Sequence, residues 1–147
     1  MSGIRASIDI AAPPPHVWAL LMDPSRLGEW VTIHHALREA PNGELGLGSH
    51  LTQTLRLRGA NFTVRWKVVE FDAPSRAVWE GRGPARSRAR ITYELWPTEH
   101  GTRFDYVNEF HPPGGPLGAV AGRVLVGGIT RHEANASLRR LAALAET

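Results

Sequence analysis

Hydrophobic and polar residues alternate at the start of the chain, and the spacing then becomes helical. Every second residue of 4–11 is apolar, which is typical of a strand with one buried face. Over 13–21 the apolar positions change to helical spacing behind a run of prolines that suits a helix start. A second short helix is expected over 23–30, where Asp23 or Ser25 can cap the first turn.

Period-two segments separated by short turns fill the middle of the chain. The expected strands lie at about 34–41, 47–58, 61–71, 76–82, 86–97 and 102–111. Short turns rich in Gly, Pro, Asn and Asp imply that successive strands are antiparallel neighbours. One long helix over 117–145 follows. This order predicts an α+β fold in which a curved antiparallel sheet of seven strands wraps around the last helix and encloses a cavity.

Alternation within the strands indicates which side chains face that cavity. The inward sets are Leu51, Gln53, Leu55 and Leu57; Phe62, Val64, Trp66 and Val68; Ala89, Ile91, Tyr93 and Leu95; and Phe104, Tyr106, Asn108 and Phe110. Five of these side chains carry a polar group that needs a partner when buried: Gln53, Trp66, Tyr93, Tyr106 and Asn108. Each group either orients a ligand carbonyl or hydroxyl or is satisfied within the core, and the sequence leaves both interpretations open.

The last predicted helix carries a hydrophobic face at three- and four-residue steps. Its members are Leu117, Val120, Val124, Gly127, Ala134, Leu138 and Leu141. Gly127 and Gly128 indicate a kink, a close approach to a ligand or strand, or a break that tertiary packing fills. The candidate ligand-binding residues are therefore Gln53, Leu55, Trp66, Tyr93, Phe104, Tyr106, Asn108, Val124 and Gly127.

Two adjacent histidines, His34 and His35, open the second predicted strand. Because neighbouring strand residues face opposite ways, at most one of them points inward. A neutral imidazole there could act as a general base, since its ordinary pKa lies near 6.5. A surface histidine is the alternative. The other histidines show no metal-ligand spacing, and we expect no metal.

Composition narrows the class of protein. The 147 residues carry a net charge of +3 and fit one domain, residues 1–147. The chain contains no cysteine, which excludes disulfides and thiolate sites, and neither a signal-peptide pattern nor an apolar run of about 20 residues is present. We therefore expect a cytoplasmic protein without a membrane span. No phosphate-binding, dinucleotide-binding or nucleophile motif occurs, and no cofactor is expected.

Sixteen of the seventeen basic residues are arginine, and four of them gather at Arg82, Arg86, Arg88 and Arg90. This segment is either an anionic contact surface or a solvated outer face of the sheet. We expect no nucleic-acid partner. The oligomeric state stays open.

The layout resembles the helix-grip fold of the START-like superfamily, in its polyketide cyclase/dehydrase and lipid-transport (SRPBCC) branch. The similar segments are residues 8–13 running into His16-Val17-Trp18, then residues 23–30, Leu45-Gly46-Leu47-Gly48-Ser49 and Gly101-Thr102-Arg103-Phe104. The resemblance implies a tunnel between the sheet and the long helix that takes an apolar or aromatic molecule. These motifs are structural, so no catalytic residue follows from the resemblance.

Three functions remain open. The first is binding or carriage of a hydrophobic, lipid- or polyketide-like small molecule. The second is a cofactor-free aromatase/cyclase or related lyase or isomerase, with His34 or His35 as its base. The third is an interaction module that uses the arginine-bearing sheet face.

Overall fold

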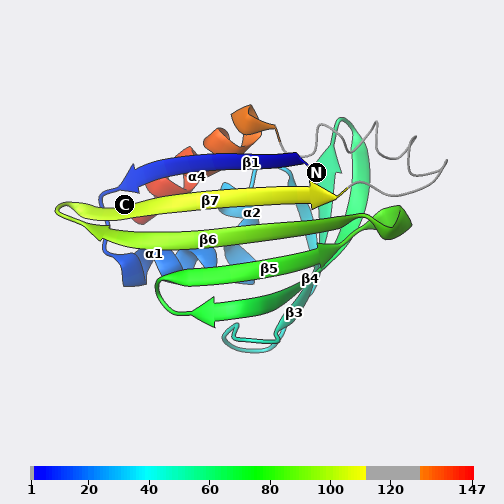
Figure 1. The fold of residues 1–147 in the computed structure, drawn as a ribbon, viewed down its shortest axis with the longest axis horizontal. Coiled ribbons are helices and arrows are strands. Elements are labelled where there is room, and N and C mark those ends of the chain that lie inside the picture. Colours follow the sequence, from blue (N-terminus) through cyan, green and yellow to red (C-terminus); the bar gives the residue numbers. More distant parts are fainter. Residues whose placement is uncertain (1, 112–129) are drawn as a thin grey trace.

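A seven-stranded antiparallel sheet dominates the computed structural model, which describes residues 2–111 and 130–147. The strand order is β1-β7-β6-β5-β4-β3-β2 (Figure 1). The strands are β1 (Ser2–Ile10), β2 (His34–Glu39), β3 (His50–Leu57), β4 (Ala60–Asp72), β5 (Arg76–Arg82), β6 (Arg88–Thr98) and β7 (Gly101–His111). The helical elements are α1 (Pro14–Leu21), η1 (Pro24–Arg26), α2 (Leu27–Trp30), η2 (Pro84–Arg86) and α4 (Arg131–Ala145). The α+β helix-grip fold expected from the sequence is confirmed.

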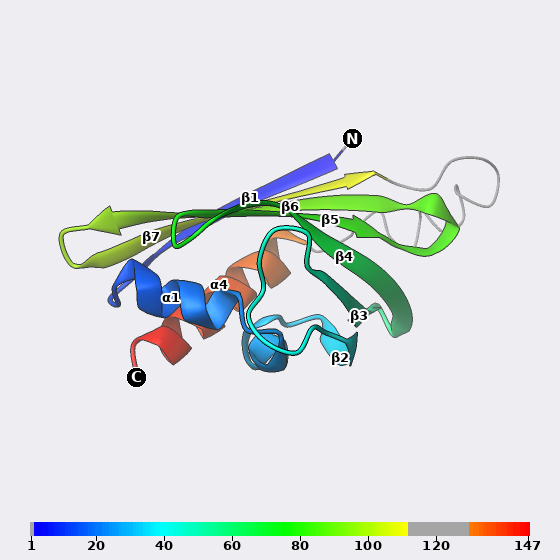
Figure 2. The ribbon, with the colours of Figure 1, turned by 90° about the horizontal axis from the view of Figure 1, so that it is seen from below.

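Successive strands from β2 to β7 pair as neighbours, and β1 joins the sheet beside β7. The helices α1, α2 and α4 all lie on one side of the sheet, and β3 and β2 bend toward that side (Figure 2). The curved sheet therefore surrounds a space that the helices close. The opposite face of the sheet is free of helices in the described residues.

Local sequence explains where the helices begin. The Asp23 carboxylate accepts hydrogen bonds from the backbone N–H and the hydroxyl of Ser25, which caps the first turn after α1. Thr130 and Glu133 form a reciprocal capping box at the start of α4. The expectation of one continuous helix over 117–145 is wrong, because Thr130 has an extended backbone and α4 begins only at Arg131. The residues before Thr130, with the candidates Val124 and Gly127, lie outside the described residues.

The face of α4 that packs on the sheet matches the predicted stripe. Ala134, Leu138 and Leu141 are at most 1% exposed. On β6 and β7 the aromatic rings of Tyr93, Phe104 and Tyr106 contact one another in stacked and edge-on pairs. Phe104, the fully buried ring of the three, belongs to the solid part of the core. Among the helices of the described residues, none is long and apolar enough to cross a bilayer.

Three predicted strands have boundaries that differ clearly from the structure. The second and third strands are shorter than expected, and residues 40–49 connect them; there Leu47 is 72% exposed. The strand expected at 86–97 begins at Arg88, because Pro84–Arg86 form the short helix η2. Arg86 therefore does not share a strand face with Arg88 and Arg90.

Candidate functional site

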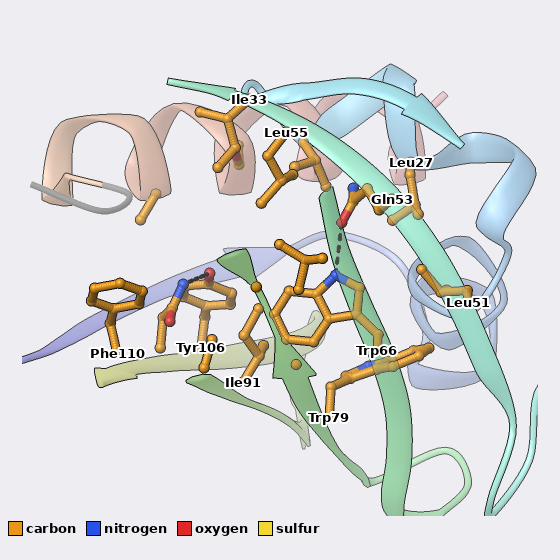
Figure 3. A pocket seen from close by; sticks show the side chains of 18 of the residues that line it. Leu27, Ile33, Leu51, Gln53, Leu55, Trp66, Trp79, Ile91, Tyr106 and Phe110 are labelled. Carbon is orange, nitrogen blue, oxygen red and sulfur yellow. Dashed lines mark hydrogen bonds between the residues drawn. The ribbon is translucent and has the colours of Figure 1, made fainter. Parts of the chain in front are cut away.

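A cavity of about 280 Å³ lies between the inner face of the sheet and the helices. Figure 3 shows Ile33 and Leu55 on one side of this space and Ile91, Tyr106 and Phe110 on the other. Its walls are mostly aliphatic and aromatic, and no Asp or Glu of the described residues lines them. The volume is close to the lower end of the range for ligand pockets, about 300–1,000 Å³. The space suits a compact apolar molecule.

The position of Trp66 depends on a glycine in the neighbouring strand. Gly81 lies opposite Trp66 in the pairing of β4 with β5, and both residues line the cavity. A Cβ atom added at Gly81 would lie 2.6 Å from two carbons of the indole ring and 2.9 Å from Val64 Cγ1. Only glycine leaves room for the indole to lie across β5.

A hydrogen-bonded chain leads from the cavity wall to the outside. The indole N–H of Trp66 donates to Gln53 Oε1 at 3.0 Å (Figure 3), and Gln53 Nε2 lies 2.8 Å from His34 Nδ1. Because indole is only a donor, the first bond fixes the orientation of the Gln53 amide. The amide NH₂ then donates to His34 Nδ1, so the imidazole is neutral and carries its proton on Nε2.

The environment of His34 favours this neutral form. Partial burial lowers the pKa of His34, and the neighbouring His35 lowers it further. A protonated imidazole would also place two donors against each other at the Gln53 amide. His34 is therefore an acceptor that supports Gln53.

The neutral form of His34 should make the free energy of unfolding depend on pH. In the unfolded chain the pKa of His34 returns to about 6.5, so between the lowered and the ordinary pKa the unfolded state binds more protons. The contribution of His34 to the free energy of unfolding should therefore be largest at pH values above this range, and it should fall as the pH drops through the range. Urea unfolding at a series of pH values measures this slope.

The control is a second histidine at the surface. His34→Gln, which keeps an acceptor for Gln53, should flatten the slope, whereas substitution of the exposed His100 should not. An unchanged slope in His34→Gln would contradict the assigned protonation state.

A second polar group lies on β6 and β7. Asn108 Nδ2 donates to the Tyr106 hydroxyl at 3.0 Å, and the Tyr93 hydroxyl has no hydrogen-bond partner in the part of the chain that the structure describes. Burial raises the pKa of Tyr106 to about 12 and raises that of Tyr93 even further. Both phenols therefore remain protonated at neutral pH and can donate hydrogen bonds.

The structure brings together six of the nine candidate ligand-binding residues. The cavity walls include Gln53, Leu55, Trp66, Tyr93, Tyr106 and Asn108. Phe104 is fully buried behind the tyrosines and does not line the cavity, while Val124 and Gly127 lie outside the described residues. That the six residues bind a ligand stays a prediction.

Neither candidate base lines the cavity. His34 lies behind Gln53, and His35 is exposed on the opposite side of β2. The sequence interpretation also omitted Trp79 and Gly81, although both are buried positions of β5 in the same alternation as Ala77. In residues 2–111 and 130–147 no three His, Cys, Asp or Glu side chains are grouped so that they could hold a metal ion.

Comparisons with known proteins agree with this architecture. The uncharacterized protein Rv1546 of Mycobacterium tuberculosis is 28% identical over 133 residues, which cover 89% of this chain and 93% of the relative. Toxin Rv0910 of the same organism is 25% identical over 127 residues, 85% of this chain and 88% of the relative. The crystal structure of TTHA0849 from Thermus thermophilus superposes with a TM-score of 0.76 at 21% identity and covers 97% of this chain and 95% of that protein.

A family described as polyketide cyclase/dehydrase and lipid transport matches residues 1–146. The match includes every strand and helix described above. The chain therefore belongs to the polyketide cyclase/dehydrase and lipid transport family.

Proposed function

We propose that this protein binds a hydrophobic or aromatic small molecule, lipid- or polyketide-like, in the cavity between the sheet and α4. The observation that carries the proposal is the cavity itself, whose apolar walls contain a few polar groups at defined positions. Empty apolar space of this size forfeits packing contacts, and a ligand would restore them. Residues 1–147 act as one ligand-binding domain, and the absence of cysteine is compatible with a cytoplasmic location.

The polar groups define which ligands fit. Tyr93 and Tyr106 offer neutral O–H donors, and the Asn108 side chain offers a carbonyl acceptor from the same wall. A ligand carbonyl or hydroxyl placed against β6 and β7 would be oriented by these groups. Its apolar remainder would contact the aliphatic side chains opposite them.

Binding without turnover is favoured over a cyclase reaction. A general base must reach the proton that it removes, and no carboxylate of the described residues lines the cavity. His34 directs its unprotonated nitrogen to Gln53. If the protein does turn over a poly-β-keto substrate through His34, then His34→Gln should lower the rate by about a hundredfold or more.

Asn108→Leu should weaken the binding of a carbonyl-bearing ligand by about 1–3 kcal/mol, since it replaces a half-buried hydrogen-bonding side chain with an apolar one of similar volume. The affinity for the matching hydrocarbon should change little, which provides an internal control. Calorimetric titration of 2-decanone and of decane into the wild-type protein and Asn108→Leu measures the two changes in affinity. Equal losses for both ligands would show that Asn108 acts only through packing.

The test of the function is native mass spectrometry of the protein purified from its own host. A retained small molecule with an apolar framework, released unaltered on denaturation, supports the proposal. Conversion of an added poly-β-keto compound during prolonged incubation would instead support the cyclase reaction. Failure of every apolar ligand to bind would contradict both.

A further inference from the structure

The outer face of the sheet carries a row of three arginines across β4, β5 and β6. Arg65 lies opposite Arg82, and Arg82 lies opposite Arg88. Directly opposed residues of antiparallel strands point to the same face, and the chain neighbours Gly81 and Ala89 line the cavity on the inner face. This arginine row therefore projects from the face that no helix of the described residues covers (Figure 2), and all three side chains are exposed.

Further cationic groups adjoin the arginine row at the same end of the sheet. His111, at the end of β7, lies opposite Arg88. Arg86 of η2 lines a hollow on the outer surface together with Arg82 and Arg88. The buried Ser87 separates this hollow from the apolar cavity, because it lines the wall of both. The positive charge thus lies outside the sheet, at the end where β5 leads into β6 and β7 ends (Figure 1).

The arginine row lacks acidic partners. No ion pair within 4.0 Å involves the row or Arg86 in the part of the chain that the structure describes, whereas Arg90, farther along the same face, binds both Glu70 and Glu80. The sequence of residues 112–129 contains neither Asp nor Glu. Like charges directly opposite each other destabilise a sheet, so the stability of the fold does not account for the row.

The side chains around the arginine row narrow the kind of anionic partner. None of the outward positions of β4 to β7 within two residues of the row is Phe, Tyr or Trp, so no such ring could stack on the bases of a single-stranded nucleic acid. The same positions offer no apolar patch for the core of a protein interface. They are Thr63, Lys67, Glu80, Arg90, Glu109 and His111.

An anionic lipid surface fits this purely electrostatic patch. With Arg86 the row holds four basic side chains, and clusters of about four to eight Lys or Arg bind membranes that contain anionic lipids. Guanidinium groups also match phosphate oxygens in a forked geometry. We propose that the arginine row docks this protein on an anionic lipid membrane.

This proposal goes beyond the binding of a ligand in the cavity. Apolar molecules leave water for the interior of a bilayer, so a membrane is a reservoir of the ligands that suit the cavity. Gly83 and Ser87 of the cavity wall lie beside Arg82 and Arg88 in the chain. Docking through the row would therefore hold this end of the cavity wall close to the lipid head groups.

The test is cosedimentation with vesicles of phosphatidylcholine alone and of an equal mixture of phosphatidylcholine and phosphatidylglycerol. At low salt the wild-type protein should bind the mixed vesicles at least about tenfold more tightly, and added salt should weaken this binding. Arg65→Gln/Arg82→Gln should lose at least about tenfold of the affinity for mixed vesicles. Because neither residue lines the cavity, calorimetric titration of decanoate into this variant should match the wild type.

The matched control is Arg139→Gln/Arg140→Gln, which removes the same charge from exposed positions of α4 and should keep vesicle binding. Equal binding of the wild type to both kinds of vesicle, no binding to either, or equal losses in the two double variants would overturn the proposal. Binding to duplex DNA or polyglutamate in place of mixed vesicles would overturn it too and assign a different partner. If decanoate fails to bind while vesicle docking persists, the proposed function fails and the docking surface stands.

Discussion

Gly81→Ala is expected to weaken ligand binding strongly while the sheet still forms. The added methyl group would lie 2.6 Å from the Trp66 ring, so the indole must leave its place across β5 and move into the cavity. That movement also breaks the hydrogen bond to Gln53. We expect the free energy of unfolding to fall by about 1–3 kcal/mol and the Kd to rise by at least about tenfold. Chemical unfolding and calorimetric titration of decanoate measure the two effects.

Gly46→Ala is the matched control for this substitution. A Cβ at Gly46 meets no atom within 4 Å, so both stability and affinity should stay near the wild-type values. A further variant, Gly81→Ala/Trp66→Ala, should lose less stability than the sum of its two single substitutions, because removal of the indole relieves the overlap. Additive losses, or full affinity in Gly81→Ala, would contradict the assigned packing.

Leu138→Ala and Leu141→Ala should distinguish a residue that lines the cavity from one that only packs in the core. Both side chains are at most 1% exposed on the inner face of α4, so each truncation should cost about 2–5 kcal/mol of unfolding free energy. Only Leu138 lines the cavity. Leu138→Ala should therefore shift binding toward longer ligands, whereas Leu141→Ala should leave the chain-length preference unchanged.

Titration of a series of carboxylates from octanoate to tetradecanoate into both variants measures this preference. The same shift in Leu141→Ala would show that the effect comes from general loosening of the core. No shift in either variant would place the ligand away from α4.

The sequence predicted the sheet well because the side-chain period of a strand is close to two. Alternation alone placed Gln53, Trp66, Tyr93, Tyr106 and Asn108 on the inner face, and all five line the cavity. The same rule, applied to β5, would have found Trp79. Hydrophobic periodicity also predicted the face that α4 buries.

The features that the sequence did not predict depend on contacts between distant residues. The role of Gly81 arises from the Trp66 ring across the strand pair, and that of His34 from Gln53 on the next strand. Phe104 has the same parity as Tyr106, yet its ring is fully buried against Tyr93 and Tyr106 and does not reach the cavity. The left-handed turn occurs at Ala85 and Arg86, neither of which is a Gly or Asn, so the sequence showed no sign of it. This turn shortens the strand that was expected at 86–97.

The indole N–H signals of the tryptophans test the central claim most directly. Of the five tryptophans, Trp30, Trp66 and Trp79 line the cavity, Trp18 packs on Phe71, and Trp96 is 51% exposed with its indole bonded to Asp105. In a heteronuclear NMR titration with decanoate, the signals of the three cavity tryptophans should shift to saturation with one common Kd. The Trp96 signal should not move. Shifts confined to Trp96, or no shift of the three cavity signals at saturating ligand, would contradict a binding site between the sheet and α4.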